Sequence, residues 1–310
     1  MYLSEKTKDL LEEKLNILNG FRPINKTILN KIRENFQVEM TYNSNAIEGN
    51  TLSKKETFWI ISEGLTIKGK SLKEHLEVKN HKEALDFLYE LIDLNKKNTI
   101  SEHLIKQLHS LVVKEADSDI AGVYRNGNVF ISGSDHIPPS GFKVSGEMNE
   151  LIKWIKKERD NYHIIELSAI LHHKLVAIHP FWDGNGRTAR IIMNILIMQA
   201  GYPMAIILKN DRQRYYRVLS EADSGNYKNL CEFLAQSVIR SLTIYLNVFN
   251  PPRKKEDKLI SLAELSRVCN YSSAYLKKLA ISNKLEAIKK GRNWFSSKKA
   301  VEDYVRSINR

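Results

Sequence analysis

Residues 179–190 read HPFWDGNGRTAR, and this stretch determines how the chain around it is organised. Two glycines, Gly184 and Gly186, leave the local backbone free to turn its N–H groups inward, which makes an anion-binding nest. The sequence that follows from Arg187, RTARIIMNILIMQA, has the pattern of a helix. The nest is therefore expected at a helix N-terminus, where the dipole and the unpaired N–H groups favour phosphate.

The charged side chains of the same stretch suit a nucleotide. Arg187 and Arg190 are three residues apart, so both lie on one helix face and can reach the same anion. Asp183 is suited to holding a Mg²⁺ ion that bridges phosphates, and the His179 imidazole is suited to removing a hydroxyl proton. Taken singly, His-Pro indicates a turn, Gly-Asn-Gly indicates a loop, and two arginines three residues apart indicate a solvated helix face. In this order they favour nucleotide transfer.

HPFWDGNGRTAR matches the Fic family motif, HPFx[D/E]GNGRxxR, at every fixed position, and the chain resembles that family from roughly residue 30 to 245. The resemblance implies a mainly α fold, with a Fic-type helical core and a β-hairpin flap. It also implies a protein adenylyltransferase, which transfers AMP from ATP to a Ser, Thr or Tyr hydroxyl of a protein and releases pyrophosphate.

The resemblance also assigns roles by position in the motif. His179 would be the general base, and Asp183 would bind Mg²⁺. The ATP-binding residues that it implies here are Asp183, Gly184, Asn185, Gly186, Arg187, Thr188, Ala189 and Arg190. Arg187 and Arg190 would hold the β- and γ-phosphates, which leaves the α-phosphorus as the attacked atom. The intact histidine argues against an inactive relative and against the phosphocholine-transferring and kinase variants.

Upstream, residues 44–49 read SNAIEG and match the family's inhibitory motif, [S/T]xxxE[G/N]. Glu48 is expected in the last turn of a helix at about 35–49, where a carboxylate opposes the dipole and invites a partner elsewhere. The resemblance is to class II members and implies that Glu48, with Ser44, occupies Arg190 and competes with the γ-phosphate. The alternatives are an exposed glutamate, or one that serves in removing AMP from a modified protein.

Residues 122–141, GVYRNGNVFISGSDHIPPSG, are rich in turn formers and contain the alternating segment NVFIS. This pattern predicts a β-hairpin, the only strand pair expected in the first 250 residues. The hairpin resembles the Fic flap, which clamps the target protein by strand addition. The flap residues that would lie nearest the nucleotide are Val129, Phe130, Ile131 and Ser132. A purely structural hairpin is the alternative.

The helix predicted at residues 209–224 contains Tyr215-Tyr216, which resembles a tyrosine pair that packs by the adenine in Fic proteins. Ordinary amphipathic packing is the alternative. Some relatives place an adenine-contacting Asn eight residues past Tyr215; this chain has Asp223, which can still accept from the adenine amino group. His172 and His173 face different sides of a helix and are expected to be packing or surface residues, not metal ligands.

The 310 residues exceed one typical domain. We expect an N-terminal helical region at 1–95, a catalytic core at 96–248, a linker at 249–257 and a winged helix-turn-helix domain at 258–310. Pro251 and Pro252 mark the linker, because proline cannot continue the preceding helix. Residues 253–310 carry 15 Lys+Arg and 6 Asp+Glu, so they supply +9 of the net charge of +12.

This basic region resembles winged helices of the excisionase type. In such a module, Tyr275, Lys277 and Lys278 would face a DNA major groove, and Lys289, Lys290 and Arg292 would meet phosphates. Protein contacts alone are the alternative. A further alternative for the whole chain is therefore a DNA-binding regulator with a nucleotide-sensing Fic core.

The composition, 42% hydrophobic, suits a globular enzyme. No apolar run approaches the length of a membrane span, and the charged first 15 residues do not resemble a signal peptide, so no membrane partner is expected. Cys231 and Cys269 are the only cysteines, which favours the cytoplasm and argues against disulfides or a zinc site. The sequence does not identify the target protein. Self-modification and a homodimer, both common in the family, stay open.

Overall fold

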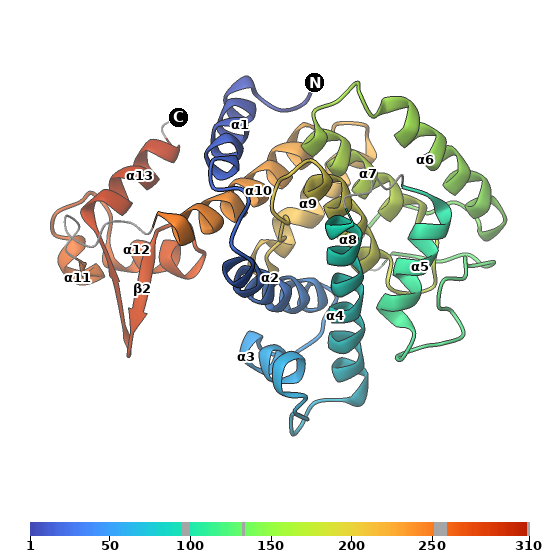
Figure 1. The fold of residues 1–310 in the computed structure, drawn as a ribbon, viewed down its shortest axis with the longest axis horizontal. Helices are drawn as coiled ribbons and strands as arrows, with labels where there is room; N and C mark the ends of the chain where they lie inside the picture. The colour runs from blue at the N-terminus through green and yellow to red at the C-terminus, as the bar shows by residue number, and fades with distance from the viewer. Residues whose placement is uncertain (95–99, 132–133, 251–258, 309–310) are drawn as a thin grey trace. The chain divides into compact units, whose positions relative to one another are not determined.

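The computed structural model describes residues 1–94, 100–131, 134–250 and 259–308 of the chain (Figure 1). The chain divides into two compact units, Met1–Leu246 and Asn247–Arg310. The division falls close to the predicted linker, but residues 251–257 of that linker lie outside the described residues. Each unit has its own hydrophobic core.

The first unit is built from helices, and no strand occurs among its described residues. Its helices are α1 (Glu5–Asn19), α2 (Lys26–Ile47), α3 (Lys54–Phe58), α4 (Leu72–Asp93), α5 (Glu102–Val113), α6 (Val144–Glu158), α7 (Ile164–Ile178), α8 (Asn185–Gln199), α9 (Arg212–Asp223) and α10 (Lys228–Phe249). A π-helical turn, Trp59–Glu63, follows α3, and short 3-10 turns at Gly141–Lys143 and Lys209–Asp211 precede α6 and α9.

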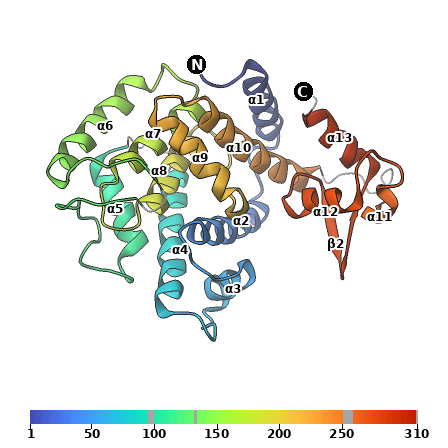
Figure 2. The ribbon, with the colours of Figure 1, turned by 180° about the vertical axis from the view of Figure 1, so that it is seen from behind.

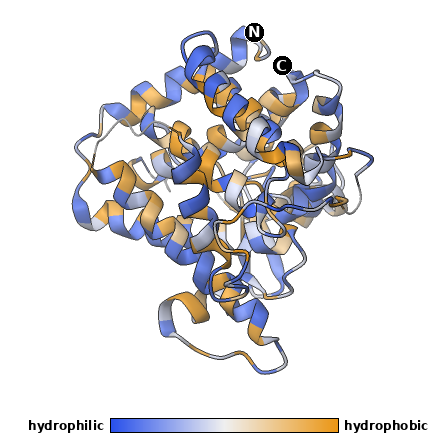
Figure 3. Ribbon diagram, turned by 90° about the vertical axis from the view of Figure 1, so that its right-hand side faces the viewer, coloured by the Kyte–Doolittle hydropathy of each residue, from blue (hydrophilic) through white to orange (hydrophobic). Residues whose placement is uncertain are grey.

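Helix α8 is the centre of this unit. It packs against α2, α4, α5 and α7, which surround it in opposite views (Figures 1 and 2). Its residues from Arg187 to Ile197 are all buried, as expected of a helix that is apolar around most of its circumference. On the outer helices, hydrophobic and hydrophilic residues alternate along the ribbon (Figure 3). Within the described ranges, no helix has the length and apolarity to cross a bilayer.

The β-hairpin predicted at residues 122–141 is not formed by strands in the described part of that segment. Arg125 holds its two arms instead: the buried guanidinium donates to the carbonyl oxygens of Gly127 and Pro139, each at 2.6 Å. Both Pro138 and Pro139 lack the N–H that a ladder requires. The described part of this segment is therefore held by one arginine and not by a strand ladder.

The second unit holds β1 (Ile260–Ser261), α11 (Leu262–Leu265), α12 (Ser273–Ile281), β2 (Ala287–Lys290), β3 (Asn293–Ser296) and α13 (Lys298–Ile308). The strands form an antiparallel sheet in the order β1-β3-β2. Its core includes Leu262, Leu276, Leu279 and Val301. The sheet thus has three strands, because β1 precedes the short helix α11 and pairs with β3.

Two buried histidines predict a loss of stability in acid. His81 and His172 are buried, and burial, with a smaller effect of Arg190, lowers the pKa of each to about 3. Their ordinary pKa is 6.5, so below that pH the unfolded chain binds more protons than the folded chain does. We expect these two groups to lower the free energy of unfolding by roughly 3 kcal/mol per pH unit between about pH 6 and 4, measured by urea titration.

Acid also raises the net positive charge, and high salt separates that contribution. Salt screens repulsion between surface charges but does not reduce the cost of burying a charged imidazole. The dependence of the free energy of unfolding on pH should therefore persist in about 1 M NaCl. If this dependence disappears at high salt, the acid sensitivity comes from charge repulsion and not from the two histidines.

Candidate functional site

His179 caps the C-terminus of helix α7, and its backbone is left-handed with φ of 50°. Residues other than glycine adopt this conformation rarely, and here Arg125 stabilises it. The Arg125 Nε donates to the His179 carbonyl oxygen at 2.7 Å, and its backbone N–H donates to the Pro180 carbonyl at 2.9 Å. Burial lowers the pKa of the His179 imidazole, and the carbonyl of Val176 opposes that shift. The imidazole is therefore neutral near pH 7 and can accept a proton.

The two glycines after His179 have separate geometric roles. Gly184 caps the N-terminus of α8 with φ of 74°, and a Cβ there would lie 2.7 Å from the Val113 Cγ1. At Gly186, a Cβ would lie 2.3 Å from the Glu48 Oε1. Between them, the Asn185 amide closes the loop, accepting from the Phe181 N–H at 2.9 Å and donating to its carbonyl at 2.8 Å. One glycine allows the turn, and the other allows the close approach of Glu48.

Arg190 is buried and contacts both residues predicted from the upstream motif. Its Nη2 donates to the Glu48 Oε1 at 2.7 Å and to the Ser44 carbonyl at 2.9 Å, and its Nε donates to the Ser44 Oγ at 3.0 Å. Burial alone would lower the pKa of Arg190, but the Glu48 carboxylate raises it above its ordinary value. The last turns of α2 therefore enclose the guanidinium and pair its charge.

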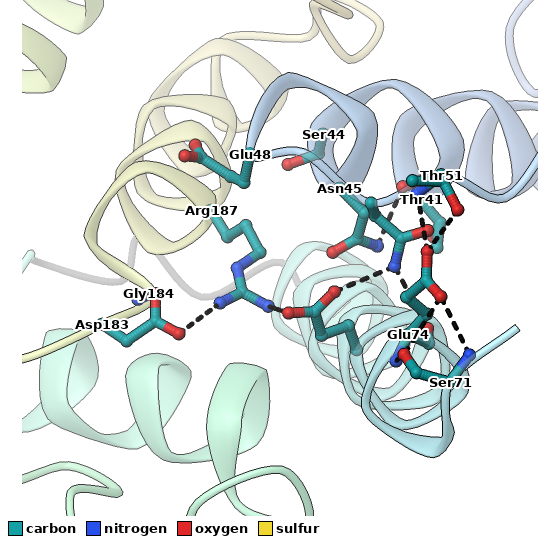
Figure 4. Close-up of polar contacts among 12 residues, drawn as sticks. Thr41, Ser44, Asn45, Glu48, Thr51, Ser71, Glu74, Asp183, Gly184 and Arg187 are labelled. Carbon is teal, nitrogen blue, oxygen red and sulfur yellow. Dashed lines mark hydrogen bonds and ion pairs between the residues drawn. The ribbon is translucent and has the colours of Figure 1, made fainter. Parts of the chain in front are cut away.

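Arg187 lines the same cavity as Arg190 but pairs with other carboxylates. Its Nη2 lies 3.3 Å from the Asp183 Oδ2 (Figure 4), and its Nη1 lies 3.6 Å from the Oε1 of Glu77 on α4. The Asn50 Nδ2 donates to the other Glu77 oxygen at 2.9 Å. Each motif arginine is thus paired with a carboxylate from a different helix. Sequence reasoning missed Glu77, because nothing in HLEVKN distinguishes it from an ordinary helix surface.

The loop that follows Glu48 is tied to α4 by a second glutamate. The Thr51 N–H and hydroxyl donate to the Glu74 Oε1 at 2.8 and 2.6 Å, and the Ser71 N–H and hydroxyl donate to its Oε2 at 3.0 Å (Figure 4). These hydrogen bonds, led by the Thr51 hydroxyl, lower the pKa of Glu74 to about 2. The loop is therefore fixed at its start on Arg190 and further along on α4.

A cavity of about 420 Å³ opens among these groups, within the range of small-molecule sites. Of the predicted residues, it is lined by Glu48, Phe130, Ile131, His179, Asp183, Gly184, Asn185, Gly186, Arg187, Arg190, Tyr215 and Asp223. Thr188 and Ala189 are on the buried side of α8 and do not line it, nor do Val129 and Ser44. Ser132 lies outside the described residues.

Helix α9 forms one wall of this cavity. At its start, the Arg212 Nε donates to the Ile47 carbonyl at 2.8 Å, and at its end the Asp223 Oδ1 accepts from the His173 Nε2 at 2.9 Å. Tyr215 is 1% exposed, and its hydroxyl is hydrogen bonded to the His172 Nε2 at 2.6 Å. The two histidines, predicted to be packing or surface residues, are thus both packed inside, and each fixes a residue of the cavity wall.

Asp183 fits the predicted Mg²⁺ in its chemistry. Its side chain is 54% exposed, and the His109 Nε2 fixes its backbone by donating to the Asp183 carbonyl at 2.9 Å. In the described part of the chain, no group of three or more His, Cys, Asp or Glu residues could hold a metal. Mg²⁺ is commonly held by one or two carboxylates together with substrate phosphates, so Asp183 fits an ion that binds with a nucleotide.

Known proteins resemble this chain in both sequence and fold. Residues 99–197 match the Fic/DOC family. The protein adenylyltransferase Fic of Nematostella vectensis is 36% identical over 245 residues, covering 79% of this chain and 56% of that protein. The chain is 34% identical to the Aedes aegypti protein of the same name over 246 residues, which cover 79% and 48% of the two. The chain thus spans about half the length of these curated relatives.

Two solved structures place the helical unit in the same fold. Fic-1 (residues 134–508) from C. elegans has a TM-score of 0.70 at 30% identity, covering 79% of this chain and 73% of that one. A Fic domain-containing signaling protein from Bacteroides thetaiotaomicron has a TM-score of 0.72 at 27% identity, with coverage of 78% and 98%. The chain belongs to the Fic/DOC family, and the prediction of a mainly α, Fic-type core is confirmed.

The Glu77–Arg187 contact predicts the effect of removing one carboxylate. In Glu77→Gln, Arg187, 3% exposed, keeps only Asp183 as an ionic partner, so we expect a loss of about 1–3 kcal/mol in the free energy of unfolding. Glu83→Gln is the matched control on α4, because Glu83 pairs with Lys114 at the surface, where about 0.5 kcal/mol is expected. Equal losses in the two variants, measured by urea titration, would contradict a special role for Glu77.

Proposed function

We propose that this chain is a protein adenylyltransferase that transfers AMP from ATP to a Ser, Thr or Tyr hydroxyl of a protein. Family membership and the names of its relatives support this activity. The cavity supports it independently, because a neutral imidazole, two arginines and the N-terminus of α8 meet on its walls. These groups supply the proton acceptor and the positive charge that phosphoryl chemistry requires.

In the proposed reaction, the His179 imidazole accepts the proton of the target hydroxyl as that oxygen bonds to the α-phosphorus. The bond from the α-phosphorus to the bridging oxygen breaks, and pyrophosphate leaves. Arg187 and Arg190 offset the charge of the β- and γ-phosphates. Asp183 would hold Mg²⁺, which contributes further charge neutralisation when bound. The Arg125-fixed segment beside His179, with Phe130 89% exposed, would offer the target an exposed docking segment.

We further propose that Glu48 keeps this reaction in check. The 2.7 Å contact between the Glu48 Oε1 and the Arg190 Nη2 is the observation on which the proposal rests. A γ-phosphate bound to Arg190 would need the place that this carboxylate takes, and two anions cannot share it without strong repulsion. Productive binding of ATP therefore requires that Glu48 moves away from Arg190.

Removing the Glu48 carboxylate should activate transfer. With α-³²P-labelled ATP and Mg²⁺, we expect Glu48→Gly to label itself or lysate proteins at least about tenfold more than the parent chain does. The reason is that loss of the Glu48 carboxylate leaves Arg190 free to pair with the γ-phosphate. His179→Ala should abolish labelling in either background. Glu34→Gly, the same change at an exposed position of α2, is the matched control and should not activate.

Two results would contradict this account. Absence of labelling by Glu48→Gly with His179 intact would refute the transfer reaction. Equal activation by Glu34→Gly would show that loosening of α2, not loss of the carboxylate, releases the activity. The reverse reaction is the alternative use of Glu48, which lines the same cavity as His179. It predicts that the parent chain releases AMP from a labelled protein and that Glu48→Gly does not.

A second candidate function concerns the basic unit, for which we propose binding to DNA. Lys277 and Lys278 are exposed on α12, and Lys289 and Lys290 are exposed on β2. Tyr275 is 39% exposed, and its hydroxyl is hydrogen bonded to that of Tyr304 at 3.0 Å. Exposed lysines on a short helix and an adjacent hairpin are the arrangement that meets phosphates in winged helices.

Charge reversal tests this candidate. In fluorescence anisotropy with duplex DNA, we expect binding at about 50 mM salt that weakens by at least about tenfold at about 200 mM. The reason is that the lysines release counterions from the DNA when they bind, and added salt opposes that release. Lys277→Glu with Lys278→Glu should abolish binding. The pair Lys298→Glu and Lys299→Glu makes the same charge change on α13 and should reduce it less. No binding at low salt, or equal losses in the two pairs, would contradict the assignment.

A further inference from the structure

Arg187 lies between two carboxylates that have different surroundings. The Asp183 Oδ2 lies 3.3 Å from the Arg187 Nη2 (Figure 4), and the Glu77 Oε1 lies 3.6 Å from its Nη1. The Asp183 side chain is 54% exposed and lines the cavity, whereas the Glu77 side chain is 14% exposed and does not line it. A nucleotide that enters the cavity would therefore meet Asp183 and Arg187, with Glu77 behind them on α4.

Glu77 is fixed on its other side by Asn50, which is buried in the loop between α2 and α3. The Asn50 Nδ2 donates to the Glu77 Oε2 at 2.9 Å and to the Glu74 carbonyl at 3.2 Å. The Asn50 Oδ1 accepts from the Leu52 N–H at 3.0 Å. Glu77 thus offers only one oxygen to Arg187, and turning away from the guanidinium would break its bond to Asn50.

The Arg187 guanidinium is buried with fewer partners than it can bind. It is 3% exposed, and its Nε has no hydrogen-bond partner in the described part of the chain. Without Glu77, it could move toward Asp183 and form the bidentate pair that arginine and carboxylate favour. The Asp183 Oδ1 already accepts from the Gly184 N–H at 2.6 Å. Arg187 and a bound cation would therefore compete for the Asp183 Oδ2.

Glu77 differs from Glu48 in its relation to a nucleotide. Glu48 lines the cavity and takes the place that a γ-phosphate on Arg190 would need. Because Glu77 does not line the cavity, a phosphate can approach Arg187 without displacing it. Glu77 therefore does not compete with the nucleotide for space, and its effect on the site acts through Arg187.

We propose that Glu77 is a positioning residue, which holds Arg187 back from Asp183 and so leaves the Asp183 Oδ2 available to Mg²⁺. Its negative charge acts in the same direction, because it offsets the charge of Arg187 near the place of the metal. When Mg²⁺ binds with a nucleotide, the contact between Arg187 and Asp183 opens, and the contact between Arg187 and Glu77 persists. This inference rests on the proposed nucleotide transfer and adds a residue of α4 to its site.

Binding of ADP with and without Mg²⁺ tests the proposal, because ADP lacks the γ-phosphate that would meet Arg190. The protein is the Glu48→Gly, His179→Ala variant, titrated by calorimetry in EDTA and at rising Mg²⁺ concentrations. Adding Glu77→Gln should raise the Mg²⁺ concentration that gives half of the metal effect by at least about fivefold. In EDTA, the same change should tighten ADP or weaken it by less than about twofold, because it removes a negative charge near the phosphates.

Glu83→Gln is the matched control, because it makes the same change on α4, where Glu83 pairs with Lys114. It should change neither quantity by more than about twofold. A merely structural role of Glu77 predicts that Glu77→Gln weakens ADP equally in EDTA and in Mg²⁺, and this result would overturn the proposal. An unchanged or lower Mg²⁺ requirement would also overturn it while the proposed function stands. If ADP does not bind even with Glu77 intact, the nucleotide site itself is refuted.

A crystal structure of the Glu48→Gly, His179→Ala variant with Mg²⁺ and ADP tests the proposal without a substitution at Glu77. We expect the Glu77 Oε1 to stay within about 4 Å of the Arg187 Nη1, and the Asp183 Oδ2 to leave Arg187 for the metal. A complex in which Asp183 stays on Arg187, or in which Arg187 leaves Glu77, would overturn the proposal. This result does not depend on the folding of Glu77→Gln.

Discussion

Burial of the Arg190 guanidinium is the constraint on which the rest of the site depends. At 1% exposure this side chain cannot rely on water to stabilise its charge, and a buried charge is tolerated only when it is paired and hydrogen bonded. Glu48 supplies the charge, and Ser44 supplies two further acceptors. The end of α2 must therefore stay against α8, or another anion must replace it.

Under the proposed function, this requirement would let a nucleotide and a helix exchange places on one guanidinium. A terminal phosphate brings the same sign of charge and the same acceptor oxygens as a carboxylate, so either can satisfy Arg190. Gly186 is part of the same arrangement, because any larger residue would collide with Glu48. The neighbouring Arg187 is paired separately with Glu77 and Asp183. The contact with Glu48 thus involves one arginine, while the other is paired with Glu77 and Asp183.

The sequence could predict those parts of the site that lie close together in the chain. The turn at Gly184 and the pairing of Glu48 with Arg190 followed from two short motifs, as did the helix, which was predicted from Arg187 and begins at Asn185. Glu77 could not be found in this way, because it belongs to an ordinary amphipathic helix and meets Arg187 only after α4 and α8 pack. The same holds for His173 and Asp223, which are 50 residues apart.

The segment at residues 122–141 shows a different limit of predicting structure from a sequence pattern. Its alternation is real, but alternation predicts an extended backbone and does not say which groups take up the hydrogen bonds. Arg125 takes the carbonyls of Gly127 and Pro139 that a ladder would have used, and through the His179 carbonyl it also fixes the proposed base. A single buried arginine therefore replaces a strand pair, a substitution that no local pattern would indicate.

The most direct test of the central claim compares ATP with AMP by isothermal titration. AMP lacks the phosphates that would reach Arg190, so Glu48 should oppose the binding of ATP only. In a His179→Ala background, we predict that Glu48→Gly tightens MgATP at least about tenfold and changes the dissociation constant of AMP less than about twofold. An equal gain for both ligands, or no gain for ATP, would contradict a carboxylate that excludes the terminal phosphate.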